Sequence, residues 1–305
     1  MTTAKRKKEI TDLLFYLSLI ILPLIQFIIF YVIVNANSFA LAFKKYEFTV
    51  DGQYVSSPAG FSNFAKVISD LFTKEEFKYC FRNSAVFYLV TFLSGTVLSM
   101  LFSFYIYKKR FLSGTFKTFL YMPSIVSVMV ISVLFRYFCV DCYPTIIEDL
   151  TGKVIAGYSG SKYAHIVFFN FFISFGGNML VYTGTMAGIS DSIIEASEVD
   201  GVNSVQQFWY VVLPQIYQTF ALFVVTGLLV LFSGQANMFN FFGLKPDGPE
   251  YYTFGYYMYV EIANNVKDYA KYSYLSALGL VITAVAIPVI FVARYLFNKF
   301  GPKDA

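Results

Sequence analysis

The sequence predicts an all-α integral membrane protein with six transmembrane helices. Its 305 residues are 57% hydrophobic and only 14% charged, and the mean hydropathy is +0.59. Such a composition is typical of a polytopic membrane protein, because a soluble domain of this length needs more charge to cover its surface. Helices are expected because a membrane-spanning segment must satisfy its own backbone polar groups. The modest net charge of +4 argues against a nucleic-acid partner.

Six segments are long and apolar enough to cross a bilayer, which takes about 20 residues in a helix. The first has too long an apolar run for a cleavable signal peptide, and no small-residue cleavage site follows it. The predicted spans cover residues 12–34, 83–107, 117–138, 164–188, 216–239 and 272–297.

The basic residues near the span ends set the predicted orientation. "KRKK" precedes the first span and "KKR" follows the second, and Lys and Arg favour the cytoplasmic side. The 35–82 loop also carries Lys and Arg, but the first helix usually dominates. We therefore predict a single transmembrane domain over 1–305, with a 12–297 bundle and cytoplasmic tails at 1–11 and 298–305.

This orientation places the connection at 189–214 in the cytoplasm and three longer connections outside. The first of these, 35–82, is expected to be a loop followed by a short amphipathic segment. The other two cover 139–163 and 240–271.

The cytoplasmic connection contains "IIEASEVDGVNSVQQFWYVVLP", which has acidic residues and no Lys or Arg. Ser192 and Glu195 fit a capping box that begins a helix. Gly201 suits a left-handed turn, and Asn203 or Ser204 can cap a second helix. Proline at 214 should end or kink that helix just before the fifth span.

Its side chains divide into two groups. Glu195, Glu198 and Asp200 are expected to be available to a basic partner. The apolar residues at helical spacing, which are Val205, Phe208, Val212 and Leu213, can pack inward. From the residues alone, a surface that docks into a groove of a second protein and a solvated acidic loop remain equally open.

The pattern Glu195-Ala196-Ser197, with Gly201 six residues after the glutamate and then Leu213-Pro214, resembles the EAA loop of binding-protein-dependent ABC importer permeases. Serine stands at the third position, where alanine is usual, and valine at 211, where isoleucine is common. More of the chain resembles the carbohydrate, maltose-transporter-type branch: "GGNMLVYTGTMAGISDSIIEASEVDGV", "TFKTFLYMPSIVSVMVISVLFRYF", "SGQANMF" and "YAKYSYLSALG".

The resemblance implies a type I ABC importer permease in which this loop forms coupling helices that sit in a cleft of a cytoplasmic ATPase subunit. By position, Glu195 would pair with a basic group of the cleft, within a contact set that includes Ala196, Ser197 and Asp200. Gly201 would make the turn. Leu213 and Pro214 would tie the loop to the fifth span.

The resemblance also implies partners and a location. The chain has no GxxxxGK[ST] phosphate-binding loop, so it is not expected to be an enzyme or to hold a cofactor, and a pair of ATPase subunits would bind ATP and Mg. A second permease subunit, a non-identical sister, and an extracytoplasmic binding protein that delivers a sugar, in the first instance an oligosaccharide, complete the complex. The complex would be located in the bacterial cytoplasmic membrane. Gly95 with Ser99, or Gly184 with Gly188, could face the sister, although packing within the chain explains them as well.

Polar residues within or at the ends of the fourth and fifth spans are candidates for the substrate path, because lipid penalises them and amides can bind sugar hydroxyls. Aromatic residues, on which sugars stack, make up 20% of the chain. Hydrogen bonds between helices are the alternative explanation. The candidates are Asn178, Tyr182, Gln235, Asn237 and Asn240.

Other classes of function find less support. Cys139 and Cys142 form a single CxxC, His165 is the one histidine, and no metal site or catalytic residue is predicted. The same importer could move glycerol phosphate, a peptide or another solute. A membrane enzyme would need clustered His, Asp or Arg, and a secondary transporter working without ATP usually shows inverted repeats.

Overall fold

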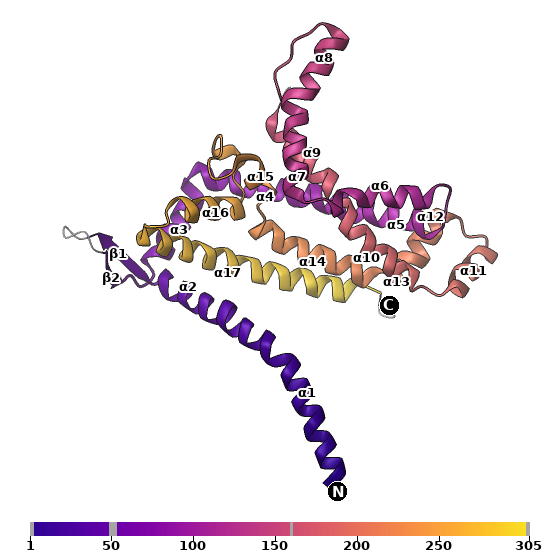
Figure 1. Ribbon diagram of the computed structural model, residues 1–305, viewed down its shortest axis with the longest axis horizontal. Coiled ribbons are helices and arrows are strands. Elements are labelled where there is room, and N and C mark those ends of the chain that lie inside the picture. Colours follow the sequence, from indigo (N-terminus) through magenta and orange to yellow (C-terminus); the bar gives the residue numbers. More distant parts are fainter. Residues whose placement is uncertain (1–2, 49–53, 159–160, 303–305) are drawn as a thin grey trace. The chain divides into compact units, whose positions relative to one another are not determined.

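The computed structural model describes residues 3–48, 54–158 and 161–302. The chain forms two compact units, one made of Met1–Asp70 and Asn265–Val281, the other of Leu71–Asn264 and Ile282–Ala305. Helices dominate both units (Figure 1). The ends of the predicted tails, 1–2 and 303–305, lie outside the described residues.

Among the described residues, five helical segments are long and apolar enough to cross a membrane, and one bent pair adds a possible sixth. The predicted helical membrane fold is thereby confirmed. The five segments are Ile10–Ala42, Glu75–Tyr107, Val128–Thr151, Lys162–Ala187 and Tyr269–Phe300, and the bent pair is Ser204–Gln215 with Tyr217–Ser233.

The first unit contains a β-hairpin that the sequence analysis treated as loop. It comprises α1 (Thr3–Phe27), a π-helical turn (Ile28–Ile33), α2 (Val34–Ala42), β1 (Lys44–Phe48), β2 (Tyr54–Pro58), most of α3 (Ser62–Thr73) and the start of α17 (Tyr269–Phe300). The strands are antiparallel, with Lys44 opposite Pro58. The Asn63 amide donates to the carbonyls of Ala42 and Lys44, at 2.8 and 2.9 Å. The predicted amphipathic segment is α3.

The second unit carries the remaining elements. These are α4 (Glu75–Thr91), a π turn (Phe92–Leu98), α5 (Ser99–Tyr107), α6 (Ser113–Ile125), α7 (Val128–Tyr137), a π turn (Phe138–Cys142), α8 (Tyr143–Thr151), α9 (Lys162–Ile173), α10 (Phe175–Ala187), α11 (Asp191–Val199), α12 (Ser204–Gln207), a π turn (Phe208–Val212), α13 (Leu213–Gln215), α14 (Tyr217–Ser233), α15 (Met238–Phe242), a 3₁₀ turn (Pro249–Tyr251), α16 (Phe254–Asn264) and the rest of α17.

The predicted third span at 117–138 is not one continuous helix. α6 ends at Ile125, Val126 is extended with ψ 142°, and a new helical run begins at Val128 and continues to Thr151. Pro123 lies inside α6 and cannot donate a backbone hydrogen bond, which weakens the last turn of that helix. The connection predicted at 139–163 therefore begins with helix.

Serine hydroxyls join α10 to the span that contains α5. Ser99 donates to the carbonyl of Phe175 at 3.0 Å, and Ser103 donates to that of Met179 at 2.9 Å. A Cβ on Gly95 would lie 3.1 Å from the side-chain nitrogen of Asn178. The Gly95–Ser99 face is thus used for packing within the chain.

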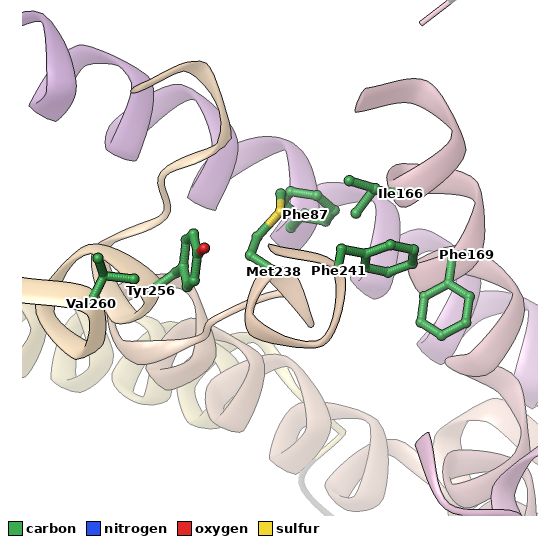
Figure 2. Close-up of a cluster of buried hydrophobic side chains, with 7 residues drawn as sticks. All are labelled: Phe87, Ile166, Phe169, Met238, Phe241, Tyr256 and Val260. Atoms are coloured by element: carbon green, nitrogen blue, oxygen red, sulfur yellow. The ribbon is translucent and has the colours of Figure 1, made fainter. Parts of the chain in front are cut away.

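Figure 2 shows the buried cluster that holds the segment after α14 against α4, α9 and α16. Its members are Phe87, Ile166, Phe169, Met238, Phe241, Tyr256 and Val260. These side chains fix the position of the non-helical residues that follow Ser233.

The fifth span is shorter than the predicted 216–239, because α14 ends at Ser233. Gly234 is extended with ψ 138°, and Ala236 and Asn237 have positive φ. The carbonyls released by this unwinding find partners elsewhere: Thr253 donates to Gly234 O at 2.9 Å, and Asn170 donates to Ala236 O at 3.1 Å.

Candidate functional site

The first helix of the 189–214 connection is α11, which begins at Asp191, two residues earlier than a Ser192 cap would allow. Ser190 is the extended residue before the helix, with φ −62° and ψ 131°. Ser192 lies in the first turn, with its hydroxyl 2.8 Å from that of Ser190. The predicted capping box of Ser192 and Glu195 is therefore wrong.

Gly201 closes α11 in the left-handed conformation that the sequence predicted, with φ +75°. Its N–H donates to Glu198 O at 3.1 Å, and the N–H of Val202 donates to Ser197 O at 3.1 Å. These two bonds form a Schellman motif, which satisfies carbonyls that the end of a helix leaves free.

The second helix, α12, is capped by Asn203, which is one of the two predicted caps. The Asn203 side chain accepts from the N–H of Gln206 at 2.9 Å, and the Gln206 side chain accepts from the N–H of Asn203 at 3.0 Å. The chain then turns at Ile216, two residues after Pro214, and α14 starts with a bend of 73°. The predicted kink before the fifth span is confirmed.

The inner face of the connection packs on a second core cluster. Phe208 and Val212 are buried together with Met100 and Met186. Leu213 packs against the same cluster. Val205 is 67% exposed, so the prediction that it packs inward is wrong. α12 is short, and its first residues face away from the cluster.

Three acidic residues of the connection, Glu195, Glu198 and Asp200, differ in their partners. Glu195 and Asp200 are exposed, and within the part of the chain that the structure describes neither side chain has an ion pair or a hydrogen bond. Glu198 instead pairs with Lys108, Nζ to Oε1 at 2.5 Å. The hydrogen bond from Lys108, together with its charge, lowers the pKa of the Glu198 carboxyl. The expectation that Glu198 is available to a partner is therefore wrong.

Ser197, the residue that departs from the EAA consensus, lies on the inner side of α11. It is buried, and its hydroxyl accepts from the Gln207 amide at 2.7 Å and donates to Ile194 O at 2.7 Å. Gln207 is 1% exposed. This buried hydrogen bond joins the two helices of the connection.

A cavity of about 550 Å³ lies in the second unit, between the spans and the unwound segment after α14. Four of the five substrate-path candidates line it: Asn178, Gln235, Asn237 and Asn240. The aromatic side chains in its wall are Phe87, Tyr88, Phe92, Phe223 and Phe239.

Tyr182 does not line this cavity. Its side chain is fully buried in the cluster that receives Phe208 and Val212, and its ring lies 5.1 Å from that of Phe223. The cavity therefore lends no support to a substrate contact by Tyr182. Asn178, which is one helical turn away on the same span, does line the cavity.

The amides in the cavity wall divide by hydrogen bonding. Asn240 donates to Asn237 at 3.3 Å, and Asn237 donates to Asn170 at 2.8 Å. Asn178 and Gln235 have no side-chain hydrogen bond among the described residues. The first group holds the unwound segment in place, and the second has donors and acceptors free for a ligand. The sequence analysis did not predict Asn170 in the cavity wall, because a single polar residue in an aromatic-rich helix gives no periodic signal.

The cysteines and the histidine form no metal-binding group within the described ranges. Cys80, Cys139 and Cys142 are all free thiols, and Cys139 is buried. The CxxC lies on a π-helical turn between α7 and α8.

The fold and the site define a multi-pass helical membrane protein with a two-helix connection before its bent span. The profile of a family described as "Binding-protein-dependent transport system inner membrane component" matches residues 83–303. The chain belongs to this family, and it is a permease of a binding-protein-dependent ABC importer located in the inner membrane. In this family the ATPase lies in partner subunits, and the permease chain holds no cofactor.

Individual relatives extend the comparison. Protein LplB of Bacillus subtilis is 25% identical over 302 residues, covering 93% of this chain and 89% of the relative. The probable starch degradation products transport system permease protein AmyD of Thermoanaerobacterium thermosulfurigenes is 26% identical over 229 residues, covering 73% of this chain and 71% of the relative. The fold is similar to that of a solved bacterial alginate ABC transporter, in complex with its alginate pentasaccharide-bound periplasmic protein, with a TM-score of 0.72, 20% identity and 96% of each chain covered.

Proposed function

We propose that this permease forms half of the pathway for a sugar, in the first instance an oligosaccharide, and that residues 189–214 couple it to a pair of cytoplasmic ATPase subunits. The observation that supports the coupling role is the set of hydrogen bonds that holds α11 and α12 together. A Schellman turn, a capping box and a buried Ser197–Gln207 bond hold the two helices rigidly, while Glu195 remains exposed and unpaired among the described residues.

The coupling is a bias on a conformational equilibrium. ATP closes the ATPase pair, the pair displaces the connection, and the permease changes from inward-facing to outward-facing. ATP can shift this equilibrium only by the difference in free energy between the contacts that the connection makes with the ATPase in the two conformations. Glu195, Ala196 and Asp200 lie on exposed positions where such contacts can form.

The proposed complex has a second permease, a non-identical sister, and an extracytoplasmic binding protein that delivers the sugar. Six spans do not enclose a pathway alone, so a sister chain supplies the other wall. Gly184 remains a candidate for that contact, because a Cβ there would meet no atom within 4 Å. The proposal puts both termini on the cytoplasmic side of a bacterial cytoplasmic membrane.

The substrate class is supported by the chemistry of the cavity. Free amides at Asn178 and Gln235 can bind hydroxyls, and aromatic rings beside them can stack on the C–H faces of a sugar. The names of the relatives agree, since AmyD is named for starch degradation products and the solved transporter for alginate.

The coupling role is tested by Glu195→Lys in the tagged chain, purified in mild detergent from its native membranes. We expect the ATPase to be lost while the chain remains inserted and the sister permease remains bound. Glu148→Lys, at an exposed acid on α8, is the matched control and should keep the ATPase. Normal ATPase recovery with Glu195→Lys would contradict the coupling role.

The substrate path is tested by Asn178→Ala in the reconstituted complex, with the binding protein and radiolabelled oligosaccharides of different composition. We expect a raised KM for uptake with unchanged assembly, because one pair of hydroxyl contacts is removed. Asn298→Ala, at an exposed amide outside the cavity, is the control. Equal uptake by the two variants would exclude Asn178 from the path.

A further inference from the structure

Two basic side chains in the turn between α5 and α6 hold the cytoplasmic connection from within the same chain. Lys108 forms its ion pair with Glu198 of α11. Arg110 donates through Nη2 to the hydroxyl of Ser204, the first residue of α12, at 3.1 Å. The turn thus contacts both helices, on either side of Gly201, and Figure 1 shows α5 and α12 at the same end of the second unit.

The turn itself is well defined. Lys108 N donates to Phe104 O, Lys109 N to Ile106 O and Ser113 N to Arg110 O, each at 3.0 Å. The Tyr105 hydroxyl donates to Phe111 O at 2.6 Å. Lys108 therefore leaves α5 from a backbone that is fixed by hydrogen bonds on both sides.

The Lys108 side chain is aimed at the connection rather than at solvent. It is 14% exposed, whereas the Glu198 side chain is 54% exposed. The ring of Phe104, one helical turn earlier on α5, lies 5.2 Å from that of Phe208 at the start of the π turn. Phe104, Lys108 and Arg110 therefore contact the π turn after α12, α11 and α12, respectively.

We propose that Lys108 and Arg110 are positioning residues that clamp both coupling helices to the cytoplasmic end of the second span. A displacement imposed on the connection by the ATPase then carries α5 with it, and α10 follows through the Ser99 and Ser103 hydrogen bonds. The clamp rests on the proposed coupling role of 189–214. It also gives the two acids different roles: Glu198 pairs with Lys108 in the clamp, and Glu195 contacts the ATPase.

The test is a pair of distances measured by spin labels in the assembled transporter, before and after addition of ATP, Mg and vanadate. One label replaces Lys109, which has no side-chain partner among the described residues, and the other replaces Val199, which is 87% exposed. A second sample pairs Val199 with Leu150 on α8, which is 77% exposed. The second pair reports whether the connection moves at all.

With the clamp intact, we expect the 109–199 separation to stay constant while the 150–199 separation shifts. In Lys108→Gln the 109–199 distribution should broaden or shift with nucleotide, because α11 is released from the turn. Lys117→Gln, at an exposed lysine on α6, is the matched control and should behave as the unmodified chain does. Should Lys108→Gln fail to insert, Glu198→Gln removes the same ion pair from an exposed position.

Charge exchange distinguishes a clamp from a general structural effect. Lys108→Glu and Glu198→Lys should each release the connection, and the two combined should restore the constant 109–199 separation. The clamp is overturned if Lys108→Gln and Lys117→Gln give the same distances, or if the combined exchange restores nothing. A 150–199 separation that ignores nucleotide would overturn the coupling role as well, whereas a shift there with no effect of Lys108→Gln would overturn the clamp alone.

Discussion

Gly201 offers the clearest test of how the two helices of the connection are held, because a Cβ there strains the backbone without meeting any neighbouring atom. A Cβ added at Gly201 would meet no atom within 4 Å, and its φ of +75° is a conformation that L-residues rarely adopt. An ordinary L-residue in this region costs about 1–2 kcal/mol. We therefore expect Gly201→Ala to weaken the turn by about that amount, with no steric contribution.

The consequence can be measured by hydrogen exchange and mass spectrometry. The amides of residue 201 and Val202 donate the two bonds of the Schellman turn. Since 1.4 kcal/mol corresponds to a factor of ten, their exchange should accelerate by about 5- to 30-fold in the purified complex. Gly201→Asn should have a smaller effect, because asparagine tolerates the left-handed region, and Gly201→Val a larger one.

Gly114→Ala provides the matched control. A Cβ there also meets nothing within 4 Å, but Gly114 lies in the first turn of α6 and has no positive φ. Alanine is the better helix former, so exchange in α6 should be unchanged or slower. If Gly201→Ala leaves the exchange of Val202 unaltered, or if both substitutions accelerate exchange equally, the conformational argument is refuted.

Three further predictions concern packing and charge. Gly255→Ala should destabilise the second unit by about 3 kcal/mol or more, because the new Cβ would overlap the carbonyl oxygen of Ser233. A lower Tm and a lower yield would show this. Gly177→Ala, whose Cβ would meet no atom within 4 Å, is the control and should fold normally. Tyr182→Phe should keep or slightly raise stability, since its buried hydroxyl has no partner among the described residues, and a folded variant that had lost uptake would contradict its placement in the core. The lowered pKa of Glu198 means that its ion pair is present at neutral pH and is lost as the pH falls through that pKa. Lys108→Gln should raise the pKa of Glu198 towards the ordinary value for glutamate, and carboxyl labelling across a pH series would detect the change. An unchanged titration of Glu198 would show that the ion pair does not form.

Several features of the fold follow from local sequence. The turn at Gly201 and a cap at Asn203 or Ser204 were predicted from the conformations and hydrogen bonds that one residue and its near neighbours allow; the turn is confirmed, and Asn203 is the cap. The spans follow from composition over about 20 residues. The β-hairpin also had a local signal that was not used, since Tyr46 and Phe48 alternate with polar residues before an Asp-Gly pair in the sequence. The Asp-Gly pair itself lies outside the described residues.

The features that the sequence analysis missed depend on contacts between distant segments. α14 ends at Ser233 because Asn170 and Thr253 supply partners for the carbonyls that unwinding releases, and neither residue is near the break in sequence. Tyr182 and Asn178 looked alike as polar residues on one helix. The packing of neighbouring helices puts the first in a core cluster and the second in a cavity wall.

The sequence by itself determined the membrane fold, the family and the glycine turn of the two-helix connection, because hydropathy, turn chemistry and a short motif are properties of adjacent residues. Only the tertiary structure decided which polar groups are committed within the chain and which remain free. Glu195 and Glu198 are three residues apart in the same acidic segment. Lys108, 90 residues away in the chain, forms an ion pair with Glu198 and not with Glu195, because ion pairing depends on distance in space and not along the sequence.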